Sequence, residues 1–182
     1  MTALDDAVVG AAAEGSRDAV EAVYRSLAPR VLGYLRARGV EDPEGLTDEV
    51  FLAVIPRLPG VRGGATGLRT LAFSVAHARA VDEHRRRAKR PAQASYEPEL
   101  DSRTEESAET EALARVATDG VEALLDELGD DQRAVVMLRV VADLSLEQTA
   151  EVLGRSVGAV KQLQRRGLLR LRALMAGKEG MS

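Results

Sequence analysis

The sequence predicts an all-α protein, and three observations support this fold class. Ala, Leu, Arg and Glu are abundant, and all four are good helix formers. Aromatic residues make up only 3% of the chain, and the apolar–polar alternation typical of strands is scarce. Apolar residues instead recur at spacings of three and four. At 182 residues, the chain is long enough for one ordinary domain or two small ones.

Three helices are expected in the N-terminal half. Ser16 can cap the first, which carries an apolar stripe and ends near Gly39. Asp42 can cap the second, with proline at its first position, and Pro56 and Pro59 end it. Residues 60–67 contain four glycines and are expected to form a loop. A third helix should then run to about residue 90.

The C-terminal half is separated from these helices by a segment rich in Ser, Thr, Pro and Glu. This composition predicts a flexible acidic linker over residues 92–115. A short helix should follow and end at Gly129, and Asp130 or Asp131 can cap the next one. The fold class is therefore two small helical domains joined by that linker.

Composition also excludes several classes of function. The chain has no Cys and only two His, so we expect no metal site and no cofactor. There is no P-loop and no Gly-x-Ser-x-Gly motif, so we expect no catalytic residues and no enzyme activity. No signal peptide or membrane-spanning run is visible, which predicts a cytoplasmic protein without a membrane partner.

The net charge is −4, but the basic residues are gathered in two places. Residues 155–178 contain seven basic residues and no acidic one, and residues 85–90 contain five basic residues in six. Eight acidic residues lie between them, over residues 92–120. Such local basic stretches are typical of nucleic-acid contacts, even in a chain that is acidic overall.

Residues 145–172 have the layout of a helix-turn-helix. Ser145 and Gln148 form a capping-box pattern, Gly154 suits a tight turn, and Ser156 can cap the second helix. The first turns of that helix are small and polar, so they can approach base edges in the major groove. The alternative is an ordinary helical hairpin with a solvated basic face, on which mixed charges are expected. The candidate DNA-binding residues are Arg155, Ser156, Gly158, Lys161, Gln162, Arg165 and Arg166.

Several segments resemble one known family. Residues 126–135 (DELGDDQRAV), 144–154 (LSLEQTAEVLG) and 156–161 (SVGAVK) are similar to region 4 of the sigma-70 family, in its extracytoplasmic-function (ECF) group. Tyr24-Arg25 and residues 29–35 and 48–52 resemble regions 2.1 and 2.2, and residues 76–87 resemble region 2.4. Ala159 and Gln162 replace the family's usual Thr and Ser, so the −35 sequence is not carried over.

The resemblance implies a sigma factor that binds core RNA polymerase and directs transcription initiation. Residues 1–91 would form region 2, which recognises and melts the −10 element, and residues 116–178 would form region 4, which reads the −35 element. The linker would occupy the RNA-exit path or act as a solubilising tether. The implied partners are promoter DNA and the β′ clamp helices and β flap of the polymerase; an anti-sigma factor is a further partner suggested by the family.

The resemblance also implies residue roles in the N-terminal half. The segment carrying residues 60–67 would capture a flipped −10 base, although its helix offers Leu71 and Phe73 where relatives have more aromatic residues. Alternatives stay open for two groups: Asp48 and Glu49 could be acids favoured by a helix start, and the Arg run could be a solvated helix end. The implied −10 contacts are Arg62, Arg69, Arg79, Asp82, Arg85 and Arg86. The implied polymerase contacts are Asp48, Glu49, Val50, Phe51 and Leu52.

The same helix-turn-helix is compatible with a second function. A free-standing helix-turn-helix repressor or activator would act without being a polymerase subunit. Such a protein normally dimerises on a palindrome, and the sequence offers no obvious dimerisation helix. It would also leave the resemblance of the N-terminal half unexplained.

Overall fold

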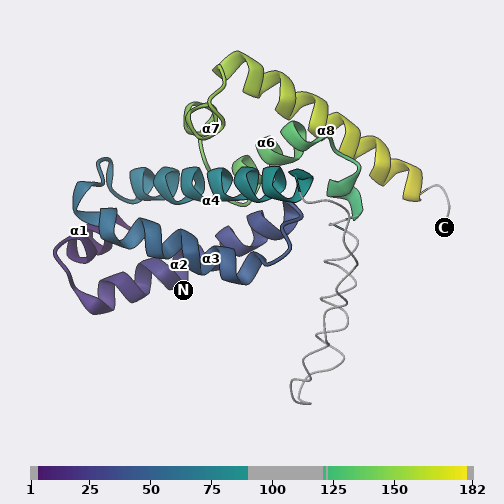
Figure 1. Ribbon diagram of the computed structural model, residues 1–182. Helices are drawn as coiled ribbons and strands as arrows, with labels where there is room; N and C mark the ends of the chain where they lie inside the picture. Colours follow the sequence, from purple (N-terminus) through teal and green to yellow (C-terminus); the bar gives the residue numbers. More distant parts are fainter. Residues whose placement is uncertain (1–3, 90–120, 122, 180–182) are drawn as a thin grey trace.

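A computed structural model describes residues 4–89, 121 and 123–179 of the chain (Figure 1). Within these residues the regular elements are helical, which agrees with the predicted all-α class. The N-terminal half contains α1 (Asp6–Ala13), α2 (Arg17–Ala37), α3 (Pro43–Val54), the 3₁₀ helix η1 (Ile55–Gly60) and α4 (Gly64–Lys89). The C-terminal half contains α6 (Asp130–Val140), α7 (Leu146–Leu153) and α8 (Val157–Glu179).

Helix α4 is the central element of the molecule. In Figure 1 it crosses the middle of the view, with α1, α2 and α3 on one side and α6, α7 and α8 on the other. It packs against α3, α2 and α1 of its own half and against α7 of the C-terminal half. Helix α2 also contacts α6. The two halves therefore lie directly against each other.

Most of the predicted helix signals occur where they were expected. The Ser16 side chain accepts a hydrogen bond from the Ala19 N–H, and Gly39 adopts φ +67° after the end of α2. Asp42 caps α3 through the Gly45 N–H at 2.8 Å, with proline in the first turn. These residues act locally, so their effect on helix ends is readable from sequence.

Three local predictions were wrong. Helix α1 was not predicted, because its eight residues are mostly small and give little periodic signal. The segment 60–67 is a loop only over residues 61–63, since η1 reaches Gly60 and α4 begins at Gly64. The cap of α6 is Gly129, and Asp130 and Asp131 lie in its first turn, where their charges favour the helix dipole.

The two halves share one apolar cluster. Large side chains from α2, α3 and α4, including Tyr34, Leu35 and Phe73, are fully buried there. The same cluster includes Leu128 and Leu138 of the C-terminal half. Burial of this surface stabilises the contact between the halves, because apolar area is removed from water on both sides. The predicted linker, residues 92–115, lies outside the described residues, and the domain boundaries remain a prediction.

Candidate nucleic-acid and polymerase interfaces

The helix-turn-helix is formed by α7 and α8, and its predicted capping box is present. Ser145 Oγ accepts the Gln148 N–H at 3.2 Å, and Gln148 Oε1 accepts the Ser145 N–H at 2.7 Å. Gly154 follows α7 with φ +61°, and the Arg155 N–H donates to the Ala150 carbonyl at 2.9 Å. These bonds set the tight turn into the second helix.

A small second core orients α8 on the helices below it. Val135 of α6, Ala150 of α7 and Val160 of α8 are buried together. Ser156 Oγ accepts the Ala159 N–H at 3.2 Å and so caps the start of α8. Since Val160 faces this core, the opposite side of the first turns of α8 faces solvent.

All seven candidate −35 residues are exposed on and just before α8. Their helical spacing of three and four places Gly158, Lys161, Gln162 and the following arginines along one side of the helix. One candidate already has a partner, since Arg155 Nη2 lies 2.6 Å from Asp131 Oδ2. Because all seven residues are exposed, the geometry is consistent with the predicted cationic face.

Further along α8, two leucines that were not among the predicted site residues are also exposed. Leu168 and Leu169 are 45% and 54% exposed, which is high for large apolar side chains. They border a shallow cavity of about 430 Å³ together with Lys161, Gln164, Arg165 and Arg172. This part of α8 presents apolar and cationic groups side by side.

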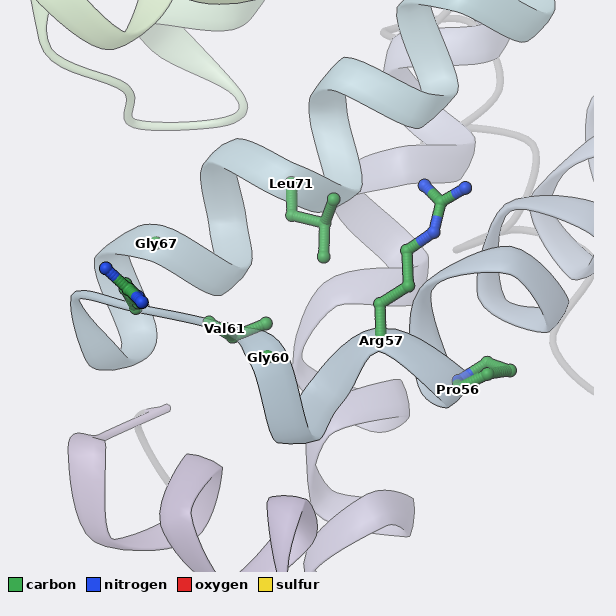
Figure 2. A pocket seen from close by; sticks show the side chains of 7 residues that line it. Pro56, Arg57, Gly60, Val61, Gly67 and Leu71 are labelled. Carbon is green, nitrogen blue, oxygen red and sulfur yellow. The ribbon is translucent and has the colours of Figure 1, made fainter.

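The N-terminal half carries a separate cavity of about 520 Å³ beside the start of α4 (Figure 2). Figure 2 shows Leu71 and Gly67 on α4 and, on the segment facing them, Arg57 and Gly60 of η1 with Val61 directly after it. Most of its lining is apolar, as in pockets that bind small molecules. The lining residues are Pro56, Arg57, Gly60, Val61, Arg62, Gly67 and Leu71.

The wall of this cavity depends on glycine at three positions. Gly63 and Gly64 have φ +81° and +56°, which side chains rarely adopt. A Cβ on Gly67 would collide with the Arg62 carbonyl. The loop therefore bends back on the first turn of α4 and leaves its backbone beside the cavity.

Candidate −10 residues lie along α4, but they differ in exposure. Asp82, Arg85 and Arg86 are exposed near its C-terminal end, and Arg85 Nη1 lies 4.0 Å from Asp82 Oδ1. Arg79 Nη1 lies 3.6 Å from Glu49 Oε2 of α3, so one predicted −10 residue touches a predicted polymerase contact. Arg62 precedes α4 and is exposed beside the cavity.

Arg69 is placed differently from the other candidates. Its side chain is only 20% exposed, and its Nη1 lies 3.2 Å from Asp143 Oδ2 in the C-terminal half. Next to it, Gln148 Nε2 donates to Thr70 Oγ1 at 2.7 Å and to the Thr66 carbonyl at 3.3 Å. Part of the candidate −10 helix is therefore covered by α7 and the turn before it.

The two histidines sit where α4 meets α2. His77 Nδ1 is 2.8 Å from the Tyr34 hydroxyl, and His84 Nε2 is 2.8 Å from the Arg38 carbonyl. Burial, together with the Arg38 charge, lowers the pKa of His77 to about 4, so its ring is neutral at neutral pH. Burial raises the pKa of Tyr34.

Two of the predicted polymerase contacts on α3 are buried in the core and are therefore not available on the surface. Val50 and Phe51 are 0% and 2% exposed, because they lie on the side of α3 that packs into the core. Asp48, Glu49 and Leu52 remain on the surface, and Leu52 is 74% exposed. Of the predicted contacts, the exposed face of α3 therefore carries two carboxylates and one leucine.

Tyr24 of α2 extends this face and was not among the predicted contacts. Its hydroxyl donates to Asp48 Oδ1 at 3.2 Å, and its ring lies 4.7 Å from that of Phe51 between centroids. Burial, followed by the hydrogen bond to Asp48, raises the pKa of Tyr24. A Tyr one helix away cannot be assigned to a face of α3 without the tertiary structure.

Over the described parts of the chain, the helices are too short or too polar to cross a lipid bilayer. The same residues contain no cluster of three or more His, Cys, Asp or Glu that could hold a metal ion.

Comparison with known proteins places this geometry in a family. Residues 124–173 match the family described as Sigma-70, region 4. The chain is 34% identical over 174 residues to the ECF RNA polymerase sigma factor SigD of Mycobacterium tuberculosis, covering 92% of this chain and 82% of SigD. It is 32% identical over 183 residues to the ECF sigma factor ShbA of Streptomyces griseus, covering 95% of this chain and 96% of ShbA.

The fold also matches a solved structure described as CnrH in complex with the cytosolic domain of CnrY. The TM-score is 0.67 at 21% identity, and the match covers 96% of this chain and 98% of CnrH. This likeness extends the agreement in fold to both halves. The chain belongs to the ECF group of the sigma-70 family and is a sigma factor that directs transcription initiation.

Proposed function

We propose that α8 reads the −35 element of the promoter and that its exposed N-terminal half is the reading surface. The observation that carries this role is the cationic stretch 155–178, which contains no acidic residue and begins on a capped helix-turn-helix. Gln162 can donate to and accept from an adenine edge, and Arg155 and Lys161 can reach guanine or phosphate. Arg165 and Arg166 would neutralise backbone phosphates.

The cavity beside η1 and α4 is the proposed site for one unstacked base of the −10 element. Extruding a base costs a few kcal/mol, which a fitted pocket can repay. The cavity offers Leu71 as an apolar wall, Arg57 and Arg62 as cations, and backbone without side chains at Gly60 and Gly67. Arg85 and Arg86 would bind phosphates of the duplex upstream of this base.

Polymerase binding is assigned to two surfaces. Asp48, Glu49 and Leu52 would dock on the β′ clamp helices, since an apolar side chain ringed by charge suits a protein interface. Leu168 and Leu169, exposed on α8, would meet the β flap. An anti-sigma factor could mask either surface; the structural neighbour CnrH was solved in complex with the cytosolic domain of CnrY.

The remaining features of the proposal follow from the family. The protein acts in the cytoplasm, has no catalytic site of its own, and leaves the chemistry to the polymerase. Residues 1–91 and 116–178 work as two domains joined by residues 92–115. For both elements of one promoter to be bound, the two halves must separate from the closed arrangement of Figure 1.

The deciding experiment is transcription by purified protein with core polymerase on a library of genomic fragments. Discrete start sites that need the protein are expected. A double variant, Lys161→Ala with Arg165→Ala, should lose most −35-dependent transcription but keep core binding. The control, Arg17→Ala, removes an exposed charge from the first turn of α2 and should change neither. Failure to bind core enzyme, with tight operator binding by the protein alone, would instead indicate a free-standing regulator.

A further inference from the structure

The glycine loop beside the cavity is held by a residue 59 positions away. Asp6 Oδ1, in the first turn of α1, accepts the Ala65 N–H at 2.8 Å. Ala65 lies in the first turn of α4, where backbone N–H groups lack partners within the helix. The preceding residues, Gly63 and Gly64, have no side chain with which to cap it. The cap is therefore supplied from another helix.

The same contact fixes the backbone that lines the cavity. A Cβ on Gly64 would collide with the Asp6 carboxylate, so the carboxylate rests directly on bare backbone. The Gly67 N–H then donates to the Gly63 carbonyl at 3.0 Å, which ties the loop to the lining residue Gly67. Asp6 thus acts on the cavity wall through the loop. It is not itself among the residues that line the cavity.

We propose that Asp6 is a positioning residue that holds the glycine loop in the shape that accepts the unstacked −10 base. The inference rests on the proposed function of the cavity and adds a residue to it. A carboxylate is a poor neighbour for DNA phosphates but a strong acceptor for a helix N-terminal amide. Its charge therefore suits a role behind the loop and not in contact with the nucleic acid.

The test uses holoenzyme assembled from the full chain and core polymerase. The probe is the single-stranded non-template −10 strand of a promoter selected by the wild-type holoenzyme, with an abasic site at each position in turn. Wild-type holoenzyme should lose affinity on the order of tenfold at one position, since a held base contributes about that much. Asp6→Ala should reduce this loss to about twofold, because an unheld loop no longer distinguishes base from no base.

Two further variants separate positioning from stability. Asp6→Asn keeps a side-chain oxygen for the Ala65 N–H and should restore most of the discrimination. Asp5→Ala is the matched control: Asp5 Oδ1 accepts the Val8 N–H, also at 2.8 Å, and caps α1 without touching the loop. It should lower the melting temperature about as much as Asp6→Ala and leave the discrimination intact.

The outcomes are distinguishable. If wild-type holoenzyme shows no position at which the missing base matters, the cavity is not a base site and both proposals fail. If wild-type discriminates and Asp6→Ala discriminates equally well, the cavity keeps its role and the role of Asp6 is overturned. Equal losses in Asp5→Ala and Asp6→Ala would also overturn it, because they would assign the effect to the stability of α1.

Discussion

Arg69 and Asp143 are joined across the two halves of the molecule. Arg69 Nη1 lies 3.2 Å from Asp143 Oδ2 and 3.3 Å from the Asp143 carbonyl oxygen. Asp143 has φ +52°, a left-handed conformation that side chains other than Asn and Asp rarely adopt. A residue predicted to bind DNA is thus held by a carboxylate of the same chain, so the proposed −10 contact of Arg69 would require this pair to break.

Several arginines between the two halves have incompletely satisfied hydrogen-bonding capacity. Among the described residues, the buried Nε atoms of Arg38, Arg69 and Arg133 have no hydrogen-bond partner. Arg38 and Arg133 nevertheless each donate through Nη1 to a carbonyl across the contact, at 2.8 and 3.4 Å. Each unpaired buried donor costs about 1–3 kcal/mol, so the closed arrangement is stabilised less than its apolar area suggests.

Asp143→Asn should shift the protein toward an open arrangement. Asn fits the left-handed turn but cannot form the ion pair, which is worth about 0.2–1 kcal/mol when a partner is as exposed as this carboxylate. The chain has no Cys, so cysteines introduced at Arg25 and Arg172 give unique dye positions for energy transfer. Transfer should fall in the Asp143→Asn variant relative to the parent.

The matched control for this prediction is Glu127→Gln, which breaks an exposed pair inside the C-terminal half. Arg170 Nη2 lies 3.0 Å from Glu127 Oε2, with both side chains about half exposed. Glu127→Gln should leave energy transfer unchanged. An equal fall in both variants would show that the Arg69–Asp143 pair has no special part in closure.

Gln148→Glu should weaken closure while keeping the helix-turn-helix intact. Glu is as good as Gln in a capping box, so the Ser145 N–H keeps its acceptor. The carboxylate cannot donate to Thr70, and it would face the Thr66 carbonyl. The contact between α7 and α4 is expected to lose about 1 kcal/mol of stabilising free energy. Energy transfer should fall while −35 DNA binding by holoenzyme is retained; loss of both would mean that α7 itself had unfolded.

Folding stability should fall as the pH is lowered from about 6.5 to about 4. The pKa of His77 is about 4 in the folded protein, lowered first by burial and then by Arg38, against 6.5 for the free side chain. Between these values the unfolded chain binds more protons, so stability is fully present above pH 6.5 and is lost as the pH falls through the folded pKa. Urea unfolding of His77→Gln should show a flatter pH dependence; an unchanged slope would contradict the assignment.

Leu52→Ser should impair polymerase binding without affecting stability. The side chain is 74% exposed, so the free energy of unfolding should change by less than about 0.5 kcal/mol. Binding to core enzyme should weaken about tenfold or more if Leu52 anchors the interface. Phe51→Ala is the contrasting variant, expected to lose about 3–5 kcal/mol of stability because the ring is buried. Thermal melting and core-binding titration of both variants measure the difference.

Two substitutions on α8 should have different signatures. Gln162→Ala should relax base preference at one −35 position by about 1–3 kcal/mol, since it removes a base contact. Arg166→Ala should weaken binding to all sequences and reduce the slope of log K against log salt by about one. Competition binding of promoter variants at several salt concentrations checks both. If both variants lost base preference to the same extent, the assignment of Gln162 to a base and Arg166 to a phosphate would be contradicted.

Local signals explain why much of the fold was predictable. The Ser16, Asp42 and Ser145 caps and the Gly154 turn act within four residues, so sequence spacing is enough to identify them. The exposed cationic side of α8 was predictable for the same reason, because its residues are three and four positions apart. Helix α1 was not predictable, because its small residues give little periodic signal. The role of Asp6 was not predictable either, because a bond between residues 6 and 65 leaves no mark in either segment alone.

The sequence by itself determined the helical class, the helix-turn-helix and the cationic face of α8, because periodicity, caps and charge are properties of neighbouring residues. Only the tertiary structure decided that Val50 and Phe51 are core, that Gln148 serves both its own helix and Thr70, and that Arg69 is held by Asp143. Those outcomes depend on which faces of distant helices meet. Burial and side-chain pairing between separate segments are set by packing, which no single stretch of sequence encodes.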